Sequence, residues 1–337
     1  MKSALTTSSN PMPAFRPSFS AAMRMVLFAT LAWTIAACGE KTESDDHMND
    51  NDSAHDNGHA HDDGGHSDHG TTQTTRIEFA AEPAAIPVGK PATWTITVVD
   101  AKTGEPVTDF DIAHEKLMHL IVVSADLSWF NHIHPRHEGN GVFTVETTLP
   151  ASGTYRLYAD YLPKGKSQEV LRHELATEGG QPSPTMILPV PDTLNSDGLF
   201  AKTVGSNPEG SPDQIEGSYH VTLQPMPTEL TAGTDVMLHF RVNDAAGKPV
   251  ALEPYLGAMG HVVIISSDGK EFLHAHPTES GAEGGEHEGH GEPSTGGAGT
   301  EVVFHTNFPA PGFYKVWGQF QKGGRIITAP FVLKIGS

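Results

Sequence analysis

Hydrophobic and polar residues alternate along short stretches throughout the chain from about residue 76 onward. "TWTITVV" (93–99) and "DVMLHFRV" (235–242) are two clear examples. Alternation with a period of two places successive side chains on opposite faces of a half-buried strand. Turns containing Gly, Pro and Asp separate these stretches, and none of them shows the 3.6-residue period of an amphipathic helix. The pattern therefore predicts an all-β protein.

The strand pattern occurs twice. "LPASGTYRLYADY" (149–161) matches "FPAPGFYKVWGQF" (308–320) in its proline, glycine and tyrosine positions, and "PVGKPATWTITVVDAKTGEPV" resembles "TAGTDVMLHFRVNDAAGKPV" farther upstream. Each copy is long enough to bury a core of its own. We therefore predict two tandem β-sandwich domains of immunoglobulin-like or cupredoxin-like type, at 76–178 and 217–337, joined by a linker at 179–216.

Both copies carry a histidine triplet with the same spacing. The first triplet is His119, His132 and His134 in "MHLIVVSADLSWFNHIHP", and the second triplet is His261, His274 and His276 in "GHVVIISSDGKEFLHAHP". Three imidazoles brought together are suited to a transition-metal ion. The six histidines are therefore candidate metal ligands.

Hairpin geometry predicts that each triplet gathers. Asp268-Gly269 between two apolar stretches indicates a two-residue turn, which pairs Ser267 with Lys270 and places His261 opposite His276. Directly opposed residues have Cβ atoms about 4.5–5.5 Å apart, and His274 shares their face. Equal spacing predicts the same for the first triplet. We expect each triplet at the end of an apolar face, where its sandwich core meets solvent.

Met259 has the same strand parity as His261 and is a further candidate ligand. Its thioether would favour Cu(I), whereas the matching position in the first copy is Leu117. Met259 could equally fill the end of the core.

A structural role for the triplets stays open, because strand histidines often serve as hydrogen-bonded core or surface residues. An enzyme is a third possibility, since three histidines with an open position can activate water. No carboxylate stands out as a general base, so the chain is predicted not to be an enzyme.

The N-terminal segment predicts export and lipid anchoring. "MRMVLFATLAWTIAAC" (23–38) resembles the bacterial lipobox, which implies a signal peptide over 1–37 and lipid on Cys38. An ordinary signal peptide is the alternative. The resemblance places the protein at the bacterial envelope, attached to the bilayer and facing the periplasm or exterior. Cys38 is the only cysteine, so a blue-copper thiolate site is excluded.

Two polar segments carry further histidines. We predict a disordered tether over 38–75 and a disordered loop over 278–299. The accessory candidates are His47, His55, His59, His61, His66 and His69 in the tether and His287 and His290 in the loop. Either segment can collect metal or serve only as a solvated spacer. The net charge of −20 argues against nucleic-acid binding and favours cations.

"HEKLMHLIVVSADLSWFNHIHP" and "PYLGAMGHVVIISSDGKEFLHAHP" resemble segments of bacterial secreted proteins and lipoproteins associated with heavy-metal handling. The domains are similar to the CopC and YtkA-like copper-binding groups. The resemblance implies binding of copper, as Cu(II) or Cu(I), with zinc as a possibility. It implies a role in metal storage, tolerance or delivery, with an unidentified protein partner for metal exchange. His114 and Lys116 belong to the first segment only.

Overall fold

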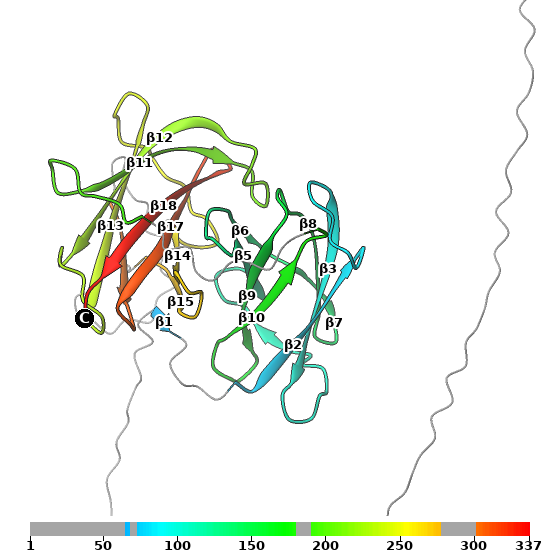
Figure 1. The fold of residues 1–337 in the computed structure, drawn as a ribbon. Helices are drawn as coiled ribbons and strands as arrows, with labels where there is room; N and C mark the ends of the chain where they lie inside the picture. The colour runs from blue at the N-terminus through cyan, green and yellow to red at the C-terminus, as the bar shows by residue number, and fades with distance from the viewer. Residues whose placement is uncertain (1–64, 68–72, 180–189, 278–300) are drawn as a thin grey trace, which may run out of the picture. The chain divides into compact units, whose positions relative to one another are not determined.

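The fold is built from strands alone wherever the structure describes the chain. The computed structural model describes residues 65–67, 73–179, 190–277 and 301–337 (Figure 1). These ranges contain no helix, which confirms the prediction of an all-β fold made of β-sandwiches. The described residues also contain no helix long and apolar enough to cross a membrane. The predicted signal peptide, Cys38, most of the tether and the loop 278–299 lie outside the described residues.

The first sandwich has one four-stranded and one five-stranded sheet. The four-stranded sheet contains, in spatial order, β2 (Thr75–Glu82), β3 (Pro91–Asp100), β8 (Val142–Thr148) and β7 (Arg136–Gly139). The other contains β10 (Glu169–Ala176), β9 (Thr154–Pro163), β5 (Met118–Ser124) and β6 (Phe130–Ile133), with β4 (Phe110–Asp111) beside β9. Trp94, Ile96 and Phe143 of the first sheet pack against Leu120 and Val122 of the second.

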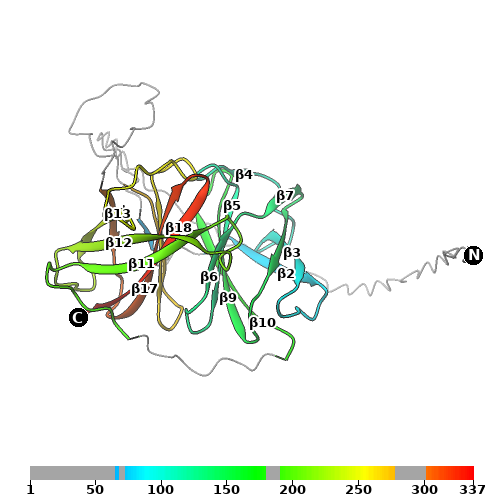
Figure 2. The ribbon, with the colours of Figure 1, turned by 90° about the horizontal axis from the view of Figure 1, so that it is seen from above.

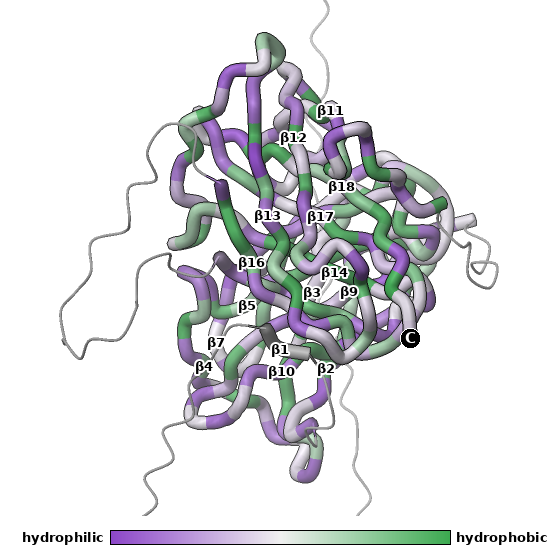
Figure 3. The backbone as a smooth tube through the Cα atoms, turned by 90° about the vertical axis from the view of Figure 1, so that its left-hand side faces the viewer, coloured by the Kyte–Doolittle hydropathy of each residue, from purple (hydrophilic) through white to green (hydrophobic). Residues whose placement is uncertain are grey.

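The second sandwich is one nine-stranded sheet whose two halves pack on each other. The order is β1 (Gly65–Ser67), β15 (Phe272–Ala275), β14 (His261–Ser266), β17 (Gly312–Lys322), β18 (Arg325–Ile335), β11 (Phe200–Asn207), β12 (Glu216–Met226), β13 (Asp235–Asp244) and β16 (Val302–Asn307). Hydrophilic and hydrophobic residues are interleaved along β12 and β13 (Figure 3). Phe240 and Phe304 of one half meet Val262, Ile264 and Phe320 of the other.

The two sandwiches repeat the same strand order. The spatial order β10-β9-β5-β6 in the first sandwich corresponds to β18-β17-β14-β15 in the second, and β2-β3-β8 corresponds to β12-β13-β16. All of these strands belong to a single compact unit that spans residues 60–337 (Figure 2). The sequence repeat is therefore a repeat of strand pairing, and β1 and β11 are additions to the second copy.

Both additions lie where the sequence predicted no structure. β11 falls within the expected linker 179–216, yet it pairs with β12 and β18. The alternating pattern of β11 is short, and the proline and glycine residues on either side of 200–204 made that segment resemble a linker. β1 falls within the expected disordered tether 38–75 and pairs with β15, so that His66 lies opposite His274 in the ladder. It covers the edge that β15 would otherwise leave open.

The two sandwiches join through a separate apolar cluster. Ile121, Phe130 and Tyr158 of the first sandwich pack with Phe272 and Trp317 of the second. Phe130 stacks on Trp317 with ring centroids 4.7 Å apart, and Tyr158 stacks on Phe272 at 4.8 Å. The expectation that this face belongs to each sandwich's own core is therefore wrong. Both faces of β5 and β14 are buried, and alternation cannot tell which of two apolar faces points inward.

We predict that Trp317→Ala destabilises the folded protein by about 3–5 kcal/mol, because it removes a large side chain that is 2% exposed at this junction. The free energy of unfolding in denaturant is the measurement. Met237→Ala is the control, since Met237 is 44% exposed and its loss should change stability by no more than about 0.5 kcal/mol. If both substitutions lowered the free energy of unfolding equally, the junction would not be an important source of stability.

Candidate metal centre between the two sandwiches

The strand registers place each triplet as predicted. In the first hairpin Ile121 pairs with His132 and Val123 with Phe130, a register that puts His119 opposite His134. The second hairpin has the same register, which puts His261 opposite His276. Five residues join the paired strands of each hairpin, 125–129 in the first and 267–271 in the second, rather than the two that the sequence predicted.

The same turn closes both hairpins. The amide of Leu127 donates to the Ser124 carbonyl at 2.8 Å, and that of Gly269 donates to the Ser266 carbonyl at 2.8 Å. Both residues have positive φ, 58° for Leu127 and 72° for Gly269. The first hairpin thus adopts a backbone that normally favours glycine, and it keeps the register without one.

Three nitrogen atoms of the first triplet form a tight triangle. His119 Nδ1 lies 3.0 Å from His132 Nε2, and His134 Nε2 lies 3.2 Å from each of these atoms. Nitrogen ligands bound at about 2.0–2.1 Å to a tetrahedral ion are about 3.3 Å apart. The spacing therefore fits a single transition-metal ion held by all three imidazoles.

The outward nitrogen of each ring in the first triplet faces a hydrogen-bond acceptor. His119 Nε2 lies 3.0 Å from the Ala113 carbonyl, His132 Nδ1 lies 2.8 Å from Gln319 Oε1, and His134 Nδ1 lies 2.5 Å from Glu209 Oε1. These oxygen atoms accept, so each outward nitrogen donates a hydrogen and the inward nitrogen keeps its lone pair. Histidines that bind metals are usually held in this way.

The second triplet repeats the arrangement. His261 Nε2 donates to the Tyr255 carbonyl at 2.8 Å, which corresponds to the contact of His119 with Ala113. His274 Nδ1 lies 2.9 Å from Asp160 Oδ2. The inward atoms His261 Nδ1, His274 Nε2 and His276 Nε2 are buried without a hydrogen-bond partner. Such groups cost about 1–3 kcal/mol each, and a metal ion bound to these nitrogens would supply the partner that they lack.

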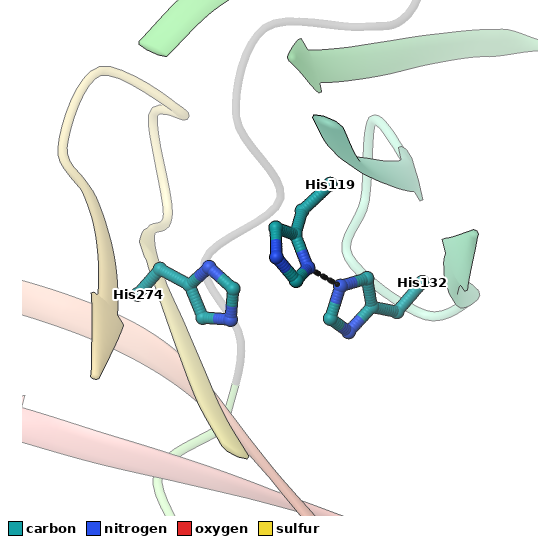
Figure 4. Close-up of side chains that lie close together, drawn as sticks. All are labelled: His119, His132 and His274. Atoms are coloured by element: carbon teal, nitrogen blue, oxygen red, sulfur yellow. Dashed lines mark hydrogen bonds between the residues drawn. The ribbon is translucent and has the colours of Figure 1, made fainter. Parts of the chain in front are cut away.

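The two triplets approach each other across the junction. His119 and His132 come from one sandwich and His274 from the other, and their rings point toward a common space (Figure 4). The ring centroid of His274 lies 5.2 Å from that of His119 and 5.4 Å from that of His132. A ligand nitrogen from each of these three residues lies within 4.8 Å of the others. We call the six histidines together the histidine centre.

His114 joins the centre, and the sequence did not identify it as a site residue. Its ring stacks on that of His276 from the other sandwich, with centroids 3.2 Å apart and an interplanar angle of 19°. His114 has a φ of 47° in a turn that precedes β5, and Leu256 takes the same place in the second copy with a φ of 52°. The sequence distinguished His114 in one way only. It is a histidine in the first copy, whereas the matching residue of the second copy is Leu256.

Met259 contacts the core of the second sandwich, which is the alternative role that the sequence left open. It packs against the core of the second sandwich, as Leu117 packs against the core of the first. β14 begins only at His261, and Leu256 and Gly257 turn the chain just before it with φ values of 52° and 75°. Met259 lies between this turn and the start of β14, so it is outside the strand, and its role as a metal ligand stays a prediction. Among the accessory candidates, only His66 lies in the described residues, and only its backbone is described.

Burial lowers the pKa of five of the six histidines. Burial, and then the neighbouring His274, lowers the pKa of His119 to about 2, although Asp160 opposes the shift. Burial also lowers the pKa of His132, His261 and His276, and it lowers that of His134 despite the Glu209 carboxylate. Metal ions bind only the neutral form of imidazole. These five imidazoles are thus in the protonation state that a metal requires.

Asp160 is the charged group inside the centre. Burial by itself would raise its pKa, but the hydrogen bond from His274 and the charge of nearby histidines lower it below its usual value. Its side chain also accepts a hydrogen bond from Gln168 Nε2 at 2.5 Å. Asp160 is only 1% exposed. Its hydrogen bonds therefore favour the ionised carboxylate in a buried position.

A family model described as "Domain of unknown function (DUF8832)" matches residues 70–177 and 213–337. No curated protein matches the chain. Similar solved structures include the Escherichia coli adhesin FdeC, with 18% identity, 79% of this chain covered and a TM-score of 0.23. The chain spans 65% of that adhesin chain's length.

A DUF3823 family protein from Bacteroides uniformis is 14% identical over 70% of this chain and 96% of its own, with a TM-score of 0.20. A carbohydrate-binding module of the β-sandwich superfamily is 10% identical over 79% of this chain and all of its own, with a TM-score of 0.21. Scores this low carry no argument about function.

The lowered pKa values predict that the metal-free protein loses stability in acid. Unfolded histidine binds a proton below about pH 6.5, whereas the folded centre does not, so stability falls as the pH drops below 6.5. Each such histidine contributes about 1.4 kcal/mol per pH unit, and for His119 the loss continues toward pH 2. Unfolding by denaturant with a chelator present, between pH 7.5 and 5, measures this slope.

His132→Gln should flatten that slope, and His220→Gln on the exposed side of β12 should leave it unchanged. A metal-free protein equally stable at pH 7.5 and pH 5 would contradict the neutral, buried state of the centre.

Proposed function

The chain belongs to the family described as a domain of unknown function, DUF8832, and we propose from the geometry of the histidine centre that it binds transition-metal ions, copper foremost. The observation that carries the proposal is the orientation of the rings. Five of the six outward nitrogens face an oxygen acceptor. The inward nitrogens of the first triplet lie 3.0–3.2 Å apart, and a ligand nitrogen from each histidine of the second triplet lies within 4.8 Å of the others. Hydrogen bonding alone does not require such convergence, but metal ligation does.

The donor set limits the choice of metal. Neutral imidazoles suit copper and zinc alike, and the groups that gather in the described part of the centre are histidines. We place copper first because of the two histidine segments' resemblance to copper-handling proteins. Met259 packs in the core, so the centre offers imidazole nitrogen to either oxidation state of copper.

We propose a binding role rather than catalysis. The cavity beside His132, lined also by Tyr255 and Gln319, has a volume of about 10 Å³, which accommodates about one water molecule. This side of the His132 ring therefore has no room for a substrate. Storage, tolerance or delivery of metal at the cell envelope fits this centre, with the bilayer reached through lipid on Cys38 and metal passed to a protein partner.

A structural or interaction module is the second candidate. Its support is the apolar junction, which joins the sandwiches without any ion, together with the hydrogen bonds that already hold most of the rings. In that case the histidines would serve as polar ends of a packed interface, and any metal would bind only to the flanking segments.

Metal retention separates the two candidates. After loading with Cu(II) and dialysis against a moderate chelator, the full chain should retain about two ions. His132→Ala with His134→Ala should remove about one ion, and His274→Ala with His276→Ala should remove the other. His220→Ala with His305→Ala, outside the centre, is the matched control. The same copper content in every variant would leave the flanking segments as the only ligands and favour the structural module.

The envelope role depends on lipid attachment, which we propose from the lipobox. Cys38→Ala should abolish incorporation of labelled fatty acid, because the thiol is the acceptor. Cys38→Ser is a second variant that keeps the size of the side chain while removing the thiol. Equal labelling of the variants and the wild-type protein would contradict the lipoprotein assignment.

A further inference from the structure

The middle histidine of each triplet, His132 or His274, is hydrogen-bonded by a residue of the other sandwich. Within the first sandwich, Asp160 on β9 lies opposite His119 on β5, yet its carboxylate accepts from His274 of the second sandwich at 2.9 Å. Within the second sandwich, Gln319 on β17 lies opposite His261 on β14, yet its amide oxygen accepts from His132 of the first sandwich at 2.8 Å.

Asp160 and Gln319 occupy equivalent positions in the repeat. They stand at the same place in "YRLYADY" and "YKVWGQF". Asp160 contacts the middle histidine of the second copy, and Gln319 contacts the middle histidine of the first. The two contacts are thus equivalent, as they are in an interface between the two subunits of a symmetric dimer. Neither triplet has its rings fully held unless the other sandwich is docked.

We infer, on the basis of the proposed metal binding, that the two triplets form one dinuclear centre in which Asp160 and Gln319 are positioning residues for the triplet of the opposite sandwich. Ligand nitrogens of His119, His132 and His274 lie within 4.8 Å of one another. Adding one metal–nitrogen bond of about 2.1 Å at each end places the two ions no more than about 9 Å apart.

The two halves of the centre differ in the burial of their carboxylate partners. His274 donates to Asp160, whose side chain is 1% exposed. In the first triplet the carboxylate partner is Glu209, whose side chain is 45% exposed and which accepts from His134, whereas His132 donates to a neutral amide. A carboxylate hydrogen bond makes an imidazole a stronger ligand, and water screens the buried pair less than the exposed one. The ring of His114 also lies on His276. The second triplet therefore holds its ion more tightly than the first, and the residue responsible is in the first sandwich.

Substitution of Asp160 tests this inference in the full chain with Cu(II). Asp160→Asn keeps the shape of the side chain and removes its charge, and it should weaken the tighter site by about 10–100-fold. The loss should persist in the His132→Ala, His134→Ala background, which leaves only the second triplet. It should be much smaller in the His274→Ala, His276→Ala background. Glu174→Gln on β10 is the matched control, since its side chain is 62% exposed and pairs with Arg156.

Gln319→Glu gives an independent test should Asp160→Asn fail to fold. A carboxylate at this position should tighten the first triplet's site and reduce the difference between the two sites. Gln321→Glu, two residues farther along β17, is its control. Electron paramagnetic resonance of the doubly loaded protein should show coupling between the two Cu(II) ions, and either pair of alanine substitutions should abolish it.

The outcomes separate this inference from the proposed function. Two retained ions that show no coupling, with Asp160→Asn affecting neither, would overturn the dinuclear centre and leave metal binding intact. One retained ion, lost in both alanine backgrounds, would instead indicate a single ion held by His119, His132 and His274, and would also overturn it. Retention of no ion by the centre would refute the proposed function and the inference together.

Discussion

Apolar packing between the outer faces of the two histidine hairpins is the interaction on which the rest of the structure depends. Ile121 and Val123 of β5 meet Val263 and Ile265 of β14, and aromatic stacking extends the contact. These residues share a strand face with the histidines, so the packing that joins the sandwiches also brings the two triplets together. Tyr158 adds a direct link, since its hydroxyl donates to the Gly269 carbonyl at 2.8 Å.

Burial at this junction has an electrostatic consequence. Charging several imidazoles in a space with little water is unfavourable, so burial lowers the pKa of five of the six histidines, whereas the hydrogen bond from His274 lowers the pKa of Asp160. A divalent ion would reverse the sign of the local charge and supply partners for nitrogens that are otherwise unsatisfied. The metal-free protein therefore carries an energetic penalty that a bound ion would relieve.

Small differences between the copies break the symmetry of an otherwise repeated design. The amide of Gln319 replaces the carboxylate of Asp160, and Leu256 replaces His114. Glu209, from the segment between β11 and β12, reaches only His134 of the first triplet. The repeated backbone thus supplies two similar ligand sets, and the side chains around them make the two sets chemically distinct.

The all-β fold, the hairpin registers and the gathering of each triplet could be predicted from the sequence, because alternation and turn residues act over short distances. β11 was missed because proline-containing segments flank it, and the ligand role of Met259, which packs against the core, stays a prediction. Only the tertiary structure decided that the histidine faces point at each other. Contacts such as His132 with Gln319 join residues 187 positions apart, and strands that are apolar on both faces carry no local signal of which face meets which partner.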